Sequence, residues 1–363
     1  MRAIDRGAVV AFVVSSLLAL ATGEIFARLY FAGTISYDHE MWRYATEVKR
    51  PAADPAIGHV HRPGAQAQLM GVDVAINEHG LRDDPIGPGG LGVETRRIAF
   101  LGDSLTFGWG VEKEETFEHR LEQALAETDT GDEQVEVLNF GTGNYNTAQQ
   151  VALFEARGLA LDPDEAVLFV FINDAEPTPE RSRWSWLGES RFVGFLWSRL
   201  KTLGSRFGEG RGWQDYYLGL YADEQPGWRT MRAALERLRD LCREHEIGLR
   251  IVLLPELHQL DPYPFEAIHT QIASEADHLG VPHLDVTPAL QGVESPQALW
   301  VAPDDAHPNA EAHRLIAEAT FPFLATPAPI PGAAPPDDGE GHGQTQELPT
   351  VDGTTTSKRA DDV

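Results

Sequence analysis

Cysteine is almost absent from this chain: Cys242 is the only one among 363 residues. A lone cysteine excludes a disulfide framework within the chain, a cysteine zinc site and an iron–sulfur cluster. Basic residues are also scarce, since 29 lysines and arginines stand against 56 aspartates and glutamates, for a formal net charge of −27. A surface this negative repels phosphate backbones, so we expect no nucleic-acid partner.

Long apolar runs are missing except at the N-terminus, where 7–23 carry no charge and basic residues precede them. This length is the lower limit for a membrane-spanning helix, and the preceding charges predict a cytoplasmic N-terminus with the body on the other side. We predict an uncleaved anchor over 1–31. A buried core helix is one alternative, and cleavage after Ala21, which follows a small-x-small pattern, is another. With or without cleavage, the body would lie outside the cytoplasm, in the periplasm or the extracellular space.

Composition divides the rest of the chain. From Thr326 onward large apolar residues almost disappear, which predicts a disordered acidic tail over 326–363. We expect an N-terminal extension over 32–94 that packs on a main domain over 95–325. Within that domain, 177–228 is rich in aromatic residues and holds five of the eight tryptophans. Two interpretations of this insert remain open: a lid or acceptor platform over the site, or a small aromatic subcore at the sheet edge.

Short β-branched runs alternate with amphipathic helical patterns through the main domain. The predicted strands are 97–101, 135–140, 166–172, 249–254 and 283–285, and the predicted helices are 116–128, 147–159, 227–246, 264–280 and 308–322. This alternation predicts an α/β fold: a three-layer α/β/α sandwich around a parallel sheet of about five strands. In such folds the site lies beyond the carboxyl ends of the strands.

Residues with reactive or hydrogen-bonding side chains lie at those strand ends. Ser104 follows Gly-Asp after the first strand, a small-residue loop over 139–147 follows the second, and Asn173 follows the third. Asp304 precedes His307 by three residues on a turn before the last helix. A serine nucleophile needs a base, and an imidazole base needs a carboxylate to fix its tautomer. Alone, each segment also has an ordinary explanation: a helix cap, a turn, a strand end or a solvated loop.

Together, Gly-Asp-Ser, the small-residue loop, Asn-Asp and Asp-x-x-His-Pro-Asn resemble the SGNH/GDSL hydrolase family over 95–325. An upstream stretch, 76–82, is similar to one that precedes the serine motif in membrane-anchored bacterial members. The resemblance implies a flavodoxin-like fold, with Ser104 as nucleophile, His307 as general base and Asp304 as its orienting partner. It implies oxyanion donors from the Ser104 backbone and the Asn173 side chain. The family's glycine donor aligns best with Asn144, with Gly141 and Gly143 close by, and the family's glycine before the Asn-Asp pair is missing here.

The implied function is a serine ester hydrolase that acts on an acyl or acetyl ester outside the cytoplasm and needs no cofactor. Its partners would be the membrane, through the N-terminal helix, and an ester of a small molecule, a lipid or an acylated glycan. Two alternatives remain: an O-acyltransferase or deacetylase of an envelope glycan, and a non-catalytic binding module on the same fold. A metal site at His59 and His61 is disfavoured because no third ligand follows at metal-ligand spacing.

Overall fold

The computed structural model describes most of the chain and gives it an α/β architecture. The residues described are 6–31, 36–86, 95–128, 134–178, 192 and 212–332. Most of the aromatic insert and all but the first few residues of the predicted tail therefore lie outside the described residues. The predicted limits of the four parts of the chain stay predictions.

Five parallel strands form the central sheet in the order β6-β5-β7-β8-β9. They are β5 (Thr95–Leu101), β6 (Gln134–Asn139), β7 (Glu165–Val170), β8 (Gly248–Leu253) and β9 (His283–Asp285). In the register at the centre, Ala99 of β5 pairs with Leu138 on one side and Ala166 on the other. The predicted three-layer fold and its five strands are confirmed, and each strand end lies within two residues of its expected position.

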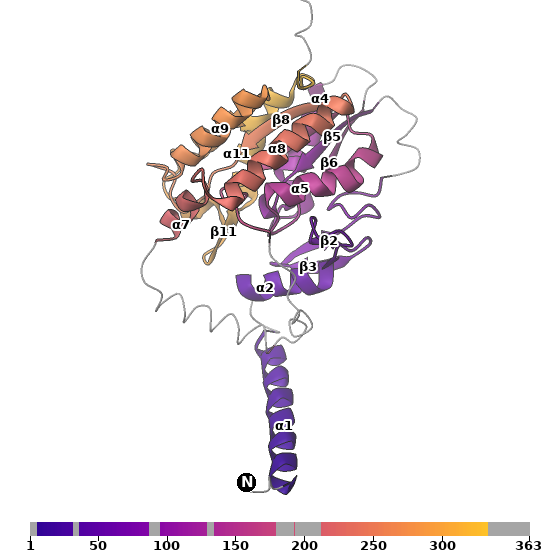
Figure 1. The fold of residues 1–363 in the computed structure, drawn as a ribbon, viewed down its shortest axis with the longest axis vertical. Helices are drawn as coiled ribbons and strands as arrows, with labels where there is room; N and C mark the ends of the chain where they lie inside the picture. The colour runs from indigo at the N-terminus through magenta and orange to yellow at the C-terminus, as the bar shows by residue number, and fades with distance from the viewer. Residues whose placement is uncertain are drawn as a thin grey trace, which may run out of the picture. The chain divides into compact units, whose positions relative to one another are not determined.

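Helices cover both faces of this sheet because successive side chains of a strand point to opposite sides. Ile98 and Phe100 pack against one helix layer, and Ala99 and Leu101 pack against the other. The first layer contains α4 (Phe117–Thr128) and α11 (Ala310–Leu324). The second contains α5 (Thr147–Leu153), α8 (Pro226–Glu244) and α9 (Glu266–Leu279), which lie across one side of the sheet in Figure 1.

Shorter elements complete the main domain. They are α3 (Ser104–Phe107), the 3₁₀ turns Lys113–Glu115, Leu159–Leu161 and Pro296–Leu299, the π-helical turn Phe154–Gly158, α7 (Trp213–Leu220), α10 (Thr287–Leu290), β10 (Trp300–Ala302) and β11 (Asp305–Pro308). The last helix differs from the prediction. Pro308 belongs to β11, where it pairs with Trp300, and α11 begins only at Ala310 because the Asn309 side chain caps it by accepting from two backbone N–H groups.

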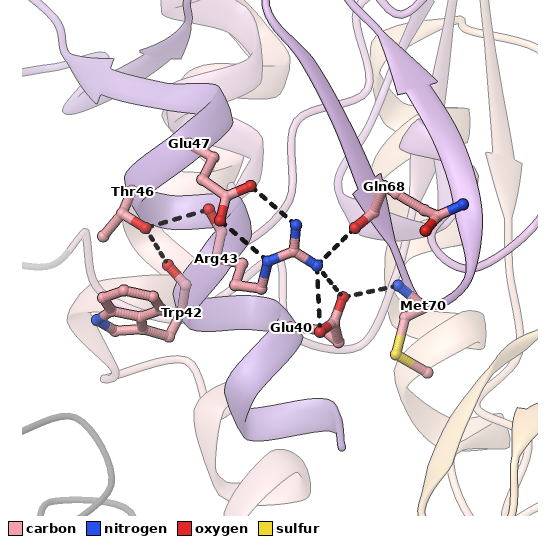
Figure 2. Close-up of polar contacts among 7 residues, drawn as sticks. All are labelled: Glu40, Trp42, Arg43, Thr46, Glu47, Gln68 and Met70. Carbon is pink, nitrogen blue, oxygen red and sulfur yellow. Dashed lines mark hydrogen bonds and ion pairs between the residues drawn. The ribbon is translucent and has the colours of Figure 1, made fainter. Parts of the chain in front are cut away.

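The N-terminal extension folds into its own small elements against the main domain. These are α2 (Tyr37–Arg43), the π-helical turn Tyr44–Val48, and two hairpins formed by β1 (Lys49–Pro51) with β2 (His59–His61) and by β3 (Gln66–Leu69) with β4 (Val72–Ala75). Arg43 joins them: it forms ion pairs with Glu40 and Glu47 and donates to the Gln68 carbonyl at 2.6 Å (Figure 2). Glu40 also accepts from the Met70 N–H. This network fixes the position of α2, whose first residue reaches the site described below.

The two ends of the described chain behave differently. Helix α1 (Arg6–Phe31) contains an apolar span of 23 residues that is long enough to cross a membrane, and its most apolar 18-residue window has no buried residue. A buried core helix, the alternative considered above, would not leave this window exposed. At the other end, the Thr326 carbonyl accepts from Arg250 and the Pro329 carbonyl accepts from Leu249 N–H. Residues 326–332 therefore pack on the main domain, although the prediction placed them in the tail.

Candidate active site

Ser104 lies at the start of α3, directly beyond the carboxyl end of β5. Gly102 allows the close turn, because a Cβ atom there would come within 1.9 Å of the Thr106 Oγ1. Asp103 caps α3 by accepting from Leu105 N–H at 2.9 Å. The Ser104 residue is 7% exposed, and its backbone N–H donates to no group among the described residues. The serine hydroxyl is thus held at a helix N-terminus, where positive partial charge gathers.

His307 reaches Ser104 from the β10–β11 hairpin. Its Nε2 lies 2.9 Å from the Ser104 Oγ, and its Nδ1 lies 2.5 Å from Oδ1 of Asp305. The expected partner, Asp304, does not make this contact and is exposed in the turn. The reason is strand geometry: residues two apart on β11 point to the same side, so Asp305 and not Asp304 shares a face with His307. The assignment of the carboxylate to Asp304 is therefore corrected to Asp305.

Asp305 is held on both of its oxygens. Oδ1 also accepts from the His307 backbone N–H at 3.1 Å, and Oδ2 accepts from the Trp109 indole N–H at 2.8 Å. Burial alone would raise the pKa of Asp305, but the hydrogen bonds from His307 and Trp109 outweigh it and place the pKa below its ordinary value. The carboxylate therefore stays ionised, and it fixes the proton of His307 on Nδ1 so that Nε2 faces the serine as an acceptor.

Asn173 follows β7 and lies beside the serine turn. Its Nδ2 donates to Oδ2 of Asp103 at 3.1 Å, which leaves the second hydrogen of the amide for another acceptor. Burial raises the pKa of Asp103, and the bonds from Leu105 and Asn173 oppose that rise. The structure thus ties Asn173 to the residue directly before Ser104.

The loop after β6 passes the same end of the sheet. A Cβ atom on Gly141 would meet the Phe107 nitrogen at 2.2 Å, so only glycine lets this loop approach α3. The backbone N–H groups of Gly141, Thr142, Gly143 and Tyr145 all donate within the protein. Among these described loop residues, the Asn144 N–H has no acceptor. Asn144 adopts a left-handed conformation with φ 64°, which glycine favours and asparagine tolerates, and this explains how Asn occupies the position of the family's glycine.

A pocket of about 400 Å³ opens beside His307. Its walls include Leu105 and Phe171 from the sheet side, and Tyr37, Trp213 and Tyr217 from the extension and the end of the insert. The Tyr37 ring lies 5.8 Å from the His307 ring, and burial raises the pKa of its hydroxyl to about 12. The pocket is thus a largely apolar space bounded on one side by the imidazole.

Three site residues escaped the sequence-based reasoning: Asp305, Trp109 and Tyr37. Asp305 is adjacent to the predicted Asp304, and an alternation of side chains along a strand before His307 was the signal that could have identified it. Trp109 and Tyr37 have no local signal. Trp109 follows α3 and acquires its partner only when hairpin β10–β11 brings Asp305 to it, and helix α2 brings Tyr37 to the site from an earlier part of the sequence.

Among the described residues, no group of three or more His, Cys, Asp or Glu side chains is placed to hold a metal ion. The two histidines of β2 are used otherwise. His59 Nε2 donates to the Gly143 carbonyl, and His61 Nδ1 donates to the Gly80 carbonyl.

Comparison with known proteins identifies the family. The model of the GDSL-like Lipase/Acylhydrolase family matches residues 100–315, more than half of the chain. The chain belongs to this family. It is therefore an ester hydrolase of the GDSL (SGNH) type, and the interpretation as a non-catalytic module is set aside.

Solved structures with a similar fold include an acetylxylan esterase from Geobacillus stearothermophilus, 16% identical, with a TM-score of 0.43, covering 63% of this chain and 94% of that one. A lipase/acylhydrolase from Enterococcus faecalis is 14% identical, with a TM-score of 0.41, covering 63% of this chain and 95% of that one. No curated protein matches the sequence.

Proposed function

We propose that the chain is a serine esterase in which Ser104 is the nucleophile, His307 the general base and Asp305 the group that orients it. The single observation that carries this is the continuous series of contacts from the Ser104 Oγ through His307 to Asp305, at 2.9 and 2.5 Å. His307 Nε2 takes the hydroxyl proton as the Ser104 oxygen attacks the ester carbonyl. The alcohol leaves with that proton, and water then attacks the acyl-enzyme by the same route and releases the acid.

The negative charge that develops on the carbonyl oxygen needs hydrogen-bond donors. We propose that three groups donate to this oxygen: the backbone N–H of Ser104, the backbone N–H of Asn144 and the second amide hydrogen of Asn173. Each N–H group of the backbone pair is without an acceptor among the described residues, as a waiting donor should be. Removing one such donor typically slows an enzyme by about 10²–10³, or roughly 3 kcal/mol of barrier.

Labelling with a fluorophosphonate probe tests this proposal. The full chain in detergent is incubated with the probe and assayed on p-nitrophenyl acetate, beside Ser104→Ala as the inactive variant and Ser15→Ala as a matched control in helix α1. We expect labelling and turnover in the wild type and in the control, and neither in Ser104→Ala. Turnover that survives the loss of the Ser104 hydroxyl would refute the assignment.

We further propose that the esterase works on a substrate close to a membrane. Helix α1 ends at Phe31 and Tyr37 already lines the pocket, so only five residues lie between the apolar helix and the site. The six Cα-to-Cα steps from Phe31 to Tyr37 span at most about 20 Å. With α1 retained in a membrane, the pocket stays near the membrane surface, on the side opposite the basic N-terminus.

Fractionation and N-terminal mass analysis test this part. We expect the mature protein to retain Met1 or Arg2 and to stay with membranes after a carbonate wash. We expect a protease added outside spheroplasts to remove the body. A mature N-terminus at Thr22 would instead show cleavage after Ala21, and a body protected from protease would reverse the proposed side.

A further inference from the structure

Lys49 is a buried amine at the start of β1 in the N-terminal extension. The residue is 5% exposed, and no carboxylate lies within ion-pair distance of its Nζ among the residues that the structure describes. The Nζ instead donates to the Gly143 carbonyl at 2.6 Å and to the Asn144 Oδ1 at 3.2 Å. It also lies 4.1 Å from the centre of the Tyr44 ring. Burying an unpaired ammonium group is costly, so its retention at this place calls for a function.

Both sides of the Gly143 peptide are held by the extension. The Gly143 N–H donates to the Tyr44 hydroxyl at 3.1 Å, and that hydroxyl donates in turn to His61 Nε2 at 2.6 Å. The Gly143 carbonyl accepts from Lys49 and also from His59 Nε2 at 3.1 Å. A short segment of the loop is therefore clamped by groups that come from roughly 80–100 residues earlier in the chain.

The carbonyl that Lys49 contacts belongs to the same planar peptide unit as the N–H of Asn144. Because the C=O and N–H of one peptide are conjugated, a cation bound to the oxygen draws electron density from the nitrogen and strengthens the N–H as a donor. The second bond, to Oδ1, holds the side chain of Asn144, whose backbone is in the left-handed conformation. One ammonium group thus both orients and polarises this peptide.

We infer that Lys49 is a positioning residue of the oxyanion hole, which acts on the transition state through the Gly143–Asn144 peptide. The inference rests on the proposed function, since it takes the Asn144 N–H as an oxyanion donor. It means that the N-terminal extension, and not the hydrolase domain alone, completes the catalytic site. Removing the amine weakens the Asn144 N–H as a donor, and this donor is used only when charge develops on the substrate oxygen. We therefore expect kcat to decrease and KM to change little.

The test compares Lys49→Met with Arg50→Met, which removes the same charge from the next, exposed position of β1. For Lys49→Met we expect kcat on p-nitrophenyl acetate to fall about 10- to 100-fold, less than the roughly 10²–10³ lost with a whole donor, with KM nearly unchanged. Affinity for a boronic acid, which forms a tetrahedral adduct with the serine, should fall by the same factor. Arg50→Met should retain the wild-type values.

The pH dependence separates a charge effect from a purely structural one. Burial lowers the pKa of Lys49 to about 7. The titratable groups that face it are Tyr44 from the preceding π-helical turn and His59 and His61 from β2. Burial raises the pKa of Tyr44 far above its ordinary value and lowers the pKa of each histidine to about 3. Only Lys49 in this cluster should change charge between about pH 5.5 and about pH 9, so the wild-type advantage over Lys49→Met should shrink across that range.

Several outcomes would overturn the inference: an unchanged kcat, a loss confined to KM, or a loss of equal size at both pH values. Lys49→Gln keeps a hydrogen-bond donor without charge and replaces the methionine variant if that variant melts at a lower temperature. We expect the kcat of Lys49→Gln to lie between those of the wild type and Lys49→Met. Ser104→Ala distinguishes the two levels of the argument. If Ser104→Ala still hydrolyses the ester, the proposed function fails. If Ser104→Ala is inactive but Lys49→Met has the wild-type kcat, only the role of Lys49 is refuted.

Discussion

The pair Asp305→Asn and Asp304→Asn separates two neighbouring carboxylates, of which Asp305 is buried against His307 and Asp304 is exposed. At position 305 an amide can present its oxygen to the Trp109 indole and its NH₂ to His307 Nδ1. That contact forces Nδ1 to accept, so the ring proton moves to Nε2, the atom that must take the proton from Ser104. We expect kcat to fall by about 10⁴, the size measured for the same change in another serine hydrolase triad. Asp304 is exposed and outside this chain of contacts, so Asp304→Asn should be near wild type.

The assay is hydrolysis of p-nitrophenyl acetate by the full chain in detergent, with thermal unfolding measured on the same samples. Asp305→Asn should be less stable by about 1 kcal/mol, because its amide can serve Trp109 and the His307 ring but then turns its NH₂ toward the His307 backbone N–H, which loses its acceptor. Asp305→Ala should be less stable by about 1–3 kcal/mol, because it leaves the buried Trp109 N–H without an acceptor. An active Asp305→Asn beside an inactive Asp304→Asn would refute the assignment of the carboxylate from the strand geometry.

Three further changes probe other parts of the chain. The Glu165 side chain is 3% exposed and forms ion pairs with two arginines. Glu165→Gln should therefore lower the free energy of unfolding, measured in urea, by about 3–5 kcal/mol. Glu155→Gln, which loses only an exposed ion pair, should leave the urea midpoint unchanged. Burial raises the pKa of Asp83 to about 7, so the folded state binds this proton more tightly than the unfolded state. The stability of the protein should therefore fall as the pH rises from about 4 to 7. Asp83→Asn should stabilise the protein at about pH 8 and not at about pH 4. Tyr37→Ala should raise KM by opening the pocket wall beside His307, with Tyr37→Phe near wild type; equal effects of the two changes would instead assign the role to the hydroxyl.

The fold followed from local patterns because the three central strands, β5, β7 and β8, are buried on both faces and contain continuous apolar runs. The runs around Ile98, Val167 and Ile251 predicted three central strands, and Gly280 correctly predicted the end of a helix, where it adopts φ 67°. The positions of Ser104 and His307 could also be anticipated, since parallel strands bring their carboxyl ends to one edge of the sheet. The structure places the two side chains within hydrogen-bonding distance.

Local patterns in the sequence were thus enough to predict the strands and helices, the apolar N-terminal helix and the motifs that contain Ser104 and His307, because these depend on periodicity and on short runs of residues. Only the tertiary structure decided which aspartate faces His307, because the register of the β10–β11 hairpin turns Asp305 inward and leaves Asp304 in solvent. It also places Tyr37 in the pocket wall and Lys49 against the Gly143 carbonyl. Those contacts join residues far apart in sequence, and they form only when the extension packs against the loops at the edge of the sheet.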